Sequence, residues 1–205
     1  MSADSPEVTR KKSNSVLKDA LSTVMVLVAA LVVALGLIAF VFQSYQVDGP
    51  SMQQTLHDKD HLIVWKLPRT WARITGHQYV PKRGDIVIFT QSGLATYGQE
   101  NTKQLIKRVI GLPGDRIVVA NNVVTVYNQQ HPHGYQPDKT LPYGPNITEP
   151  ALQNIDVTLG SDQLFVCGDN RTNSLDSRFF GPIKTNQIIG KLAVRVLPLN
   201  QIERF

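Results

Sequence analysis

A serine in a glycine- and proline-containing turn is the first candidate for chemistry. Ser51 lies in the segment Val47-Asp48-Gly49-Pro50-Ser51-Met52, and these residue types favour a sharp change of chain direction. A sharp turn can expose a serine hydroxyl together with nearby backbone amides, although Gly-Pro-Ser is also a common ordinary turn. A serine hydroxyl is a poor nucleophile unless a neighbouring base takes its proton. Ser51 therefore needs a partner elsewhere in the chain.

Lys107 is the second candidate, because of the face of a strand on which it falls. In the apolar segment 105–110, alternation places Lys107 on the same side as Leu105 and Val109. Lysine is rare on a buried face unless it is paired or functional. Burial disfavours the charged amine and lowers its pKa, so a buried lysine can act as a neutral general base. Alternatively, the side chain reaches solvent at the edge of the strand, and this segment alone does not decide.

A dense polar run suggests a loop that supports a site. It reads Gly168-Asp169-Asn170-Arg171-Thr172-Asn173-Ser174-Leu175-Asp176-Ser177-Arg178 and follows the apolar segment 164–167. Small hydrogen-bond acceptors between two arginines suit a loop that fixes its own shape. The composition favours support of a functional site over an elaborate turn.

An uncharged segment of 22 residues, 21–42, precedes these candidates. As a helix it is about 33 Å long, which matches the hydrocarbon core of a bilayer. A cleavable signal peptide has a shorter apolar core and a small-residue cleavage site, and Phe40-Val41-Phe42-Gln43 offers no such site. A buried helix in so small a protein would rarely be apolar on every face. The sequence predicts a retained single transmembrane helix.

The flanking charges predict the orientation of this helix. Arg10, Lys11, Lys12 and Lys18 precede it, whereas the first charge after it is Asp48. Positively charged flanks stay on the cytoplasmic side. We therefore expect a cytoplasmic basic tail over 1–20, a transmembrane helix over 21–42 and an extracytoplasmic domain over 43–205.

The segment after the helix has the pattern of short strands separated by turns. Apolar runs bounded by Asp, Gly and Pro predict strands over 62–65, 86–89, 105–110, 117–119, 123–127, 164–167 and 188–199. Asn121-Asn122 suits a tight hairpin. Residues 128–150 are rich in Pro, Gly, Asn and His, which indicates a surface excursion. With no long amphipathic pattern, the fold class is mainly β.

Composition excludes several function classes. The net charge is +5, but the basic residues are scattered and no groove-reading motif accompanies them, so no nucleic acid partner is expected. The single cysteine, Cys167, excludes an internal disulfide. Because zinc-ligand spacing is absent, we expect no metal and no cofactor.

The order of the motifs resembles that of type I signal peptidases, the bacterial leader peptidases that use a serine–lysine dyad. The motifs are, after the apolar segment, Pro-Ser-Met, Gly-Asp-Ile-Val, Lys-Arg-Val-Ile-Gly-Leu-Pro-Gly-Asp and Gly-Asp-Asn-Arg-x-x-Ser-x-Asp-Ser-Arg. The match extends from about residue 10 to near the end. The resemblance implies a β-rich catalytic core with a smaller β lobe inserted at about 120–160.

The resemblance also implies roles for individual residues. Ser51 matches the nucleophile and Lys107 the general base, and Ser174 matches a serine that orients the lysine amine. Asp176 and Arg178 match a buried supporting ion pair, with Asp169 and Arg171 in the same scaffold. The Ser51 N–H would stabilise the oxyanion, and Gly49 stands where some members place a second, hydroxyl donor. The implied substrate cleft is lined by Tyr45, Val47, Met52, Leu56, Ile88 and Ile106.

One position departs from the family pattern. Gln54 stands where the family usually has proline, within Ser-Met-x-Pro-Thr. Proline would stiffen the turn by fixing φ, so we expect a less rigid turn after Ser51.

The implied function is a membrane-bound serine endopeptidase that cleaves signal peptides from exported preproteins, with those peptides and membrane lipid as partners. Three alternatives remain. A histidine-based hydrolase would use His57, His61 or His77, and a cysteine enzyme would use Cys167. A non-catalytic, membrane-tethered β-domain would bind exported proteins without cutting them.

Overall fold

The computed structural model describes residues 7–96, 99–121, 123–144 and 154–205. The chain divides into two compact units, residues 1–41 and residues 42–205.

The first unit contains one long helix, α1 (Glu7–Phe40). Its apolar part, Lys18–Phe40, has 23 residues and a mean hydropathy of 2.9, so it is long and apolar enough to cross a membrane. No residue in its most apolar stretch is buried. The helix ends two residues before the predicted end of the span, and it begins within the segment that we assigned to the basic tail.

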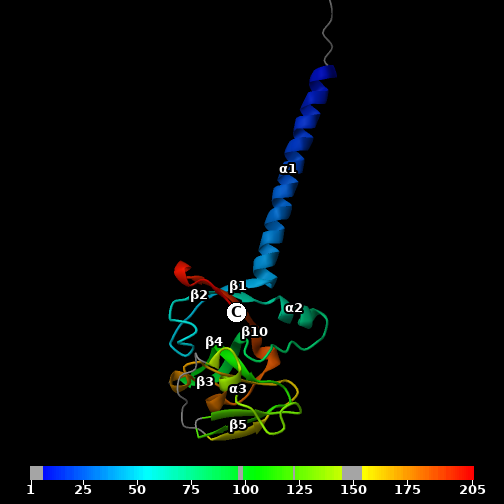
Figure 1. The fold of residues 1–205 in the computed structure, drawn as a ribbon. Coiled ribbons are helices and arrows are strands. Elements are labelled where there is room, and N and C mark those ends of the chain that lie inside the picture. The colour runs from blue at the N-terminus through cyan, green and yellow to red at the C-terminus, as the bar shows by residue number, and fades with distance from the viewer. Residues whose placement is uncertain (1–6, 97–98, 122, 145–153) are drawn as a thin grey trace, which may run out of the picture. The chain divides into compact units, whose positions relative to one another are not determined.

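The second unit is built on an eight-stranded sheet, coloured by residue number in Figure 1. Seven strands follow one another through antiparallel pairs, and β11 (Glu203–Arg204) pairs with β10. The seven strands, in spatial order, are β1 (Phe42–Gln46), β2 (His61–Trp65), β10 (Ile188–Leu197), β3 (Ile86–Thr96), β4 (Gln99–Gly111), β8 (Gln163–Cys167) and β9 (Ile183–Lys184). Consequently β4, which carries Lys107, lies in the interior of the sheet between β3 and β8.

A second, three-stranded sheet is inserted between β4 and β8. Its spatial order is β6 (Val123–Tyr127), β5 (Arg116–Ala120) and β7 (Ile155–Thr158). The predicted hairpin forms from β5 and β6, and Asn121 has the left-handed φ of 49° that a tight turn requires. Asn122 lies outside the described residues, as do 145–153 within the predicted inserted lobe.

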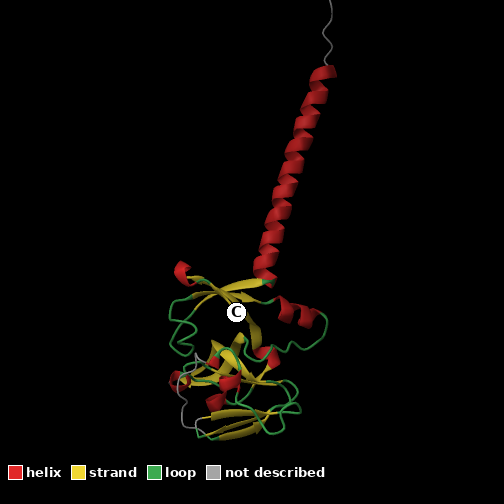
Figure 2. Cartoon of the chain, viewed as in Figure 1, coloured by secondary structure: helices red, strands yellow, loops and turns green. Residues whose placement is uncertain are grey.

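Short helices connect the strands of this unit, whose regular structure is mainly β (Figure 2). The expected mainly β fold class is therefore confirmed. The helices are α2 (Leu67–Ile74), α3 (Pro137–Thr140), α4 (Ser177–Phe180) and the 3₁₀ turns η2 (Arg171–Asn173), η3 (Thr185–Gln187) and η4 (Leu199–Gln201).

Three apolar clusters hold the unit together. One packs Met52 and Leu56 against β2 and β10, and a second joins β3, β4 and β8 around Phe89 and Val109. A third fills the inserted lobe around Ile117 and includes Tyr143. The first two clusters lie next to the segments that carry Ser51 and Lys107, and they give these side chains a packed foundation.

Candidate active site

Ser51 lies in a compact turn between β1 and β2. Backbone hydrogen bonds join Gln53 N to Pro50 O (3.0 Å) and Leu56 N to Met52 O (2.8 Å). Gly49 enters the turn with a φ of 94°, which glycine tolerates, and its N–H donates to Asp58 Oδ1 (3.1 Å).

Gln54 adopts a φ of 87° in this turn. Proline is locked near −65° and cannot adopt this conformation. The departure from the family pattern at position 54 therefore goes together with a different backbone, held by the hydrogen bonds on both sides of it.

Lys107 reaches Ser51 from the buried face of β4. Its Nζ lies 2.7 Å from Ser51 Oγ and 2.8 Å from the carbonyl oxygen of Ile106. The residue is 3% exposed, so the predicted position of this lysine on the buried side agrees with the structure. The structure thus brings the two sequence-predicted reacting groups within hydrogen-bond distance.

Burial sets the protonation of this amine. Desolvation lowers the pKa of Lys107 to about 8, because a buried ammonium loses its hydration. The negative charges of Asp176 and Asp169 act in the opposite sense and raise the pKa, but burial outweighs them. A substantial fraction of the amine is therefore neutral in mildly alkaline solution, and only the neutral amine can accept a proton.

The polar loop 168–178 is fastened to the serine turn by Asn170. Its backbone N–H donates to the Ser51 carbonyl (3.0 Å), and its side-chain Nδ2 donates to the Pro50 carbonyl (3.2 Å). Gly168 lies so close that a Cβ there would be 2.4 Å from Ser51 O and 2.3 Å from Ser174 Oγ. Only glycine fits between the loop and the turn.

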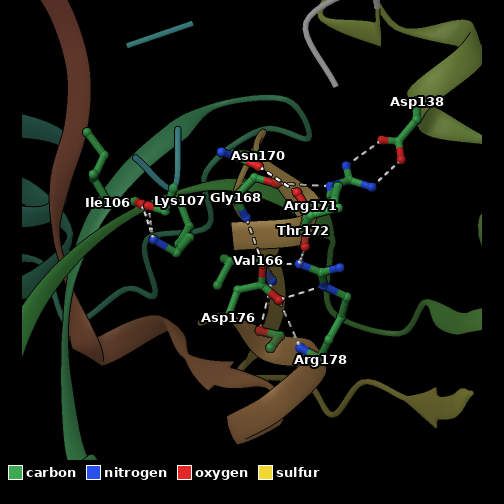
Figure 3. Close-up of polar contacts among 12 residues, drawn as sticks. Ile106, Lys107, Asp138, Val166, Gly168, Asn170, Arg171, Thr172, Asp176 and Arg178 are labelled. Atoms are coloured by element: carbon green, nitrogen blue, oxygen red, sulfur yellow. Dashed lines mark hydrogen bonds and ion pairs between the residues drawn. The ribbon is translucent and has the colours of Figure 1, made fainter. Parts of the chain in front are cut away.

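A buried ion pair fixes the far end of this loop. Arg178 Nε and Nη2 donate to the two carboxylate oxygens of Asp176 at 2.9 and 2.8 Å, and Asp176 also accepts from Gly168 N (Figure 3). The predicted pair is thus formed and buried. Because Asp176 and Arg178 neutralise each other inside the loop, this end of the loop is held without an exposed charge.

A second buried pair was not foreseen from the sequence. Arg108, the residue after Lys107, donates to both oxygens of Asp169 at 2.8 and 2.6 Å, and Thr55 Oγ1 donates to the same carboxylate at 2.5 Å. This pair connects β4, the loop and the serine turn. One indication of this pair was present in the sequence, the position of Arg108 directly after Lys107, but Arg108 was interpreted only as part of a motif.

Two further residues that sequence reasoning missed come from the surface excursion. Asp138 forms an ion pair with Arg171, and the ring of Tyr143 lies 4.5 Å from the Arg108 guanidinium. No local pattern marks either residue, because the contacts join segments far apart in the chain.

A cleft of about 280 Å³ opens beside the two reacting groups. Four of the predicted cleft residues, Tyr45, Val47, Ile88 and Ile106, line it. Met52 and Leu56 do not: both are fully buried in the apolar cluster beneath the turn, so their assignment to the cleft was wrong. The cleft is also lined by Gln46, Asp48, Leu62, Lys103, Gln104 and Leu105.

The expected role of Ser174 is not reproduced. Its Oγ is buried but has no hydrogen-bond partner in the described part of the chain, whereas the Lys107 amine bonds to Ile106 O instead.

The alternative nucleophile and bases are placed less favourably. Cys167 is fully buried, and burial raises the pKa of its thiol, which disfavours the reactive thiolate. His57 and His77 are exposed, and His61 contacts Gln46. Among the described residues no hydrogen bond joins a histidine to Ser51, and no three His, Cys, Asp or Glu side chains gather as metal ligands would.

Comparison with known proteins places this geometry in context. The sequence model of the family described as "Signal peptidase, peptidase S26" matches residues 20–197, which include the serine turn, β4 and the polar loop. Signal peptidase I of Leptolyngbya laminosa is 33% identical over 199 residues, covering 96% of this chain and 88% of its own. Signal peptidase I of Bacillus caldolyticus is 38% identical over 171 residues, covering 79% and 83% respectively. A solved signal peptidase I from Enterococcus faecalis V583 is 26% identical and covers 57% of this chain and 99% of its own, with a TM-score of 0.41.

Proposed function

Because this chain belongs to the peptidase S26 family of signal peptidases, we propose that it cleaves signal peptides with Ser51 as nucleophile and Lys107 as general base. Membership of the family supports the cleavage of signal peptides. The proposed roles of Ser51 and Lys107 rest on one observation, the 2.7 Å distance between a buried amine and a serine hydroxyl at the edge of a cleft.

The reaction is an acyl transfer in two halves. Neutral Lys107 Nζ takes the hydroxyl proton while Ser51 Oγ attacks the carbonyl carbon of the scissile bond. When the tetrahedral intermediate collapses, the C–N bond breaks, the ammonium returns the proton to the leaving amine, and an ester remains on Ser51. Water, deprotonated by the same amine, then hydrolyses this ester and restores the serine.

The oxyanion of each tetrahedral intermediate needs a hydrogen-bond donor. The Ser51 N–H is available, because no acceptor for it lies in the described part of the chain. Gly49 has no side-chain donor, and its N–H is already bonded to Asp58. A backbone amide as principal donor makes activity sensitive to the geometry of the turn, since loss of one such donor costs about 2.7–4 kcal/mol in comparable enzymes.

The cleft suits a peptide with apolar side chains before the cut. Its walls at Val47, Ile88 and Ile106 are apolar, and Ser51 and Lys107 lie at one side of it. Apolar walls favour apolar side chains before the cut. The preference for alanine-sized side chains is what the resemblance to signal peptidases implies.

We assign α1 to the membrane as a single span with the amino terminus in the cytoplasm. The length and hydropathy of Lys18–Phe40 support the span, and the flanking charges support the direction. Protease added to sealed right-side-out vesicles should digest residues 43–205 but spare the amino terminus. If only the amino terminus were digested, the helix would have the opposite orientation to the one proposed.

The test of function uses the full chain in detergent with a purified preprotein. Wild type should release the signal peptide, whereas Ser51→Ala and Lys107→Ala should be inert with unchanged circular dichroism. The matched controls are Ser161→Ala and Lys82→Ala, both at exposed positions, and they should cleave as wild type does. If wild type binds the preprotein without cutting it, the chain is a tethered binding domain instead.

A further inference from the structure

The segment Pro137–Gly144, here called the α3 segment, is packed tightly although its composition predicted a surface excursion. Pro137 is buried, and Tyr143 is 7% exposed within the apolar cluster of the inserted lobe. The segment closes on itself, because a Cβ on Gly144 would lie 2.0 Å from the Asp138 carbonyl oxygen. Its two functional side chains, Asp138 and Tyr143, are therefore held in fixed positions.

Asp138 neutralises a cation at the centre of the polar loop. Arg171 is 1% exposed, and both its terminal nitrogens pair with the Asp138 carboxylate, Nη2 to Oδ1 at 2.7 Å (Figure 3). Arg171 Nε also donates to the Gly168 carbonyl (3.0 Å), and the Arg171 carbonyl accepts from Arg178 (2.7 Å). Through Arg171, Asp138 reaches the glycine that touches the serine turn.

Tyr143 covers another buried arginine, Arg108. Its ring lies 4.5 Å from the Arg108 guanidinium, which also donates to Asp169, to Thr55 Oγ1 and to the Gly84 carbonyl. An aromatic face stabilises a desolvated cation. Arg108 is adjacent to Lys107 in β4, so the ring supports the strand that presents the amine.

We propose that the α3 segment is a clamp in which Asp138 and Tyr143 act as positioning residues for the Ser51–Lys107 site. Neither touches the reacting atoms. Asp138 holds buried Arg171 in the loop 168–178, and Tyr143 covers buried Arg108 in β4. This inference rests on the proposed function.

The physical consequence follows from removing a counter-charge from a buried cation. Without the Asp138 carboxylate, Arg171 would keep its charge but lose the anion that both its terminal nitrogens contact, and it would draw in water, because breaking a buried ion pair is strongly unfavourable. The loop would loosen against the serine turn, and the amine of Lys107, whose pKa is raised by the charges of Asp176, Cys167 and Asp169, would become better hydrated. Hydration favours the ammonium, so the base would be both displaced and more often protonated.

The experiment compares Asp138→Asn with Asp156→Asn in the full chain. Asp156 forms a similar two-point pair with Arg116 in the same lobe, but both side chains are at least half exposed. We measure kcat, KM and the pH profile on a preprotein, together with hydrogen–deuterium exchange of residues 168–178. Asp138→Asn should lower kcat about ten- to hundredfold and leave KM within about twofold of wild type. The rise of kcat with pH should occur at higher pH than in wild type, and hydrogen exchange in the loop should be faster. Asp156→Asn should change none of these.

A second pair of variants keeps the test decisive if Asp138→Asn does not fold. Tyr143→Leu removes the ring and should lower kcat in the same way. Tyr143→Phe keeps the ring and should have the kcat of wild type. Within the described residues the Tyr143 hydroxyl is buried and has no hydrogen-bond partner, so its removal should not impair folding.

The outcomes separate the clamp from the function. If Asp138→Asn and Tyr143→Leu keep wild-type kcat, pH profile and exchange, the clamp is refuted while the protease stands. If wild type itself does not cleave, the proposed function fails, and exchange in the loop still decides whether the α3 segment restrains it.

Discussion

The backbone N–H of Asn170 donates a 3.0 Å hydrogen bond to the carbonyl oxygen of Ser51. This bond, between residues more than a hundred positions apart, fixes the serine turn to the polar loop. The nucleophile's geometry therefore depends on a segment that contributes no reacting group.

The close approach of loop and turn predicts the effect of adding one methyl group. In Gly168→Ala the new Cβ would overlap Ser51 O and Ser174 Oγ, so the turn or the loop must move. We expect activity to fall at least about a hundredfold and stability by about 1–3 kcal/mol. Gly160→Ala is the control, because the atoms nearest to its Cβ would belong to the flexible Gln163 side chain, at 3.3 Å or more. Steady-state kinetics and thermal unfolding measure both effects, and an active Gly168→Ala would show that the contact is unimportant.

The left-handed backbone at Gln54 predicts opposite effects for two substitutions. Gln54→Gly relieves the positive φ and should leave stability unchanged or raise it by up to about 1 kcal/mol. Gln54→Pro restores the family's usual residue but cannot adopt this φ, so we expect it to be less stable by about 2 kcal/mol or more. Chemical denaturation measures the difference. A proline variant as stable as wild type would show that the turn readily takes the other backbone.

The lowered pKa of Lys107 predicts the pH dependence of cleavage. The ammonium dominates below a pKa of about 8 and cannot act as base, so kcat/KM should rise about tenfold per pH unit up to that value and then level. Initial rates across pH 6–10, with tryptophan fluorescence to verify folding, give the profile. A profile that is flat from pH 6 to 8 contradicts a titrating lysine base.

The cleft and the core predict different consequences for two apolar truncations. Leu56→Ala removes a fully buried side chain and should cost about 2–5 kcal/mol of stability without changing substrate preference. Ile106→Ala widens the cleft wall and should improve cleavage after residues larger than alanine. Unfolding curves and a set of preproteins varied at the cleavage site distinguish them. A change of substrate preference in Leu56→Ala would show that Leu56 contributes to the cleft.

Much of the site was predictable because its residues are rare where they occur. A lysine on the apolar face of a strand conflicts with ordinary packing, and that conflict alone marks Lys107 as a candidate. The polar loop was recognisable in the same way, and its Asp176–Arg178 pair joins residues two positions apart. The long apolar helix was evident from length and hydropathy alone, to within two residues at its carboxyl end.

The remaining features depend on contacts that a single sequence does not display. Met52 and Leu56 are apolar residues next to the nucleophile, and only the path of the turn decides that they point into the core. The pairing of Asp138 with Arg171 joins α3 to η2 across 33 positions of the chain. Helix α2 escaped prediction because eight residues give too short an amphipathic pattern, although Pro68 in its first turn is a typical start signal.

Restoring an amine at position 107 tests the account most directly. Lys107→Cys should be inert. Alkylation of the cysteine with bromoethylamine rebuilds an amine on a side chain of nearly lysine length and should restore cleavage. The same treatment should not restore cleavage to a Ser51→Ala/Lys107→Cys double variant. Wild type treated identically controls for other modification, since the only native cysteine, Cys167, is buried. Cleavage by untreated Lys107→Cys, or a folded and fully aminoethylated protein that stays inert, would contradict the lysine as the base for Ser51.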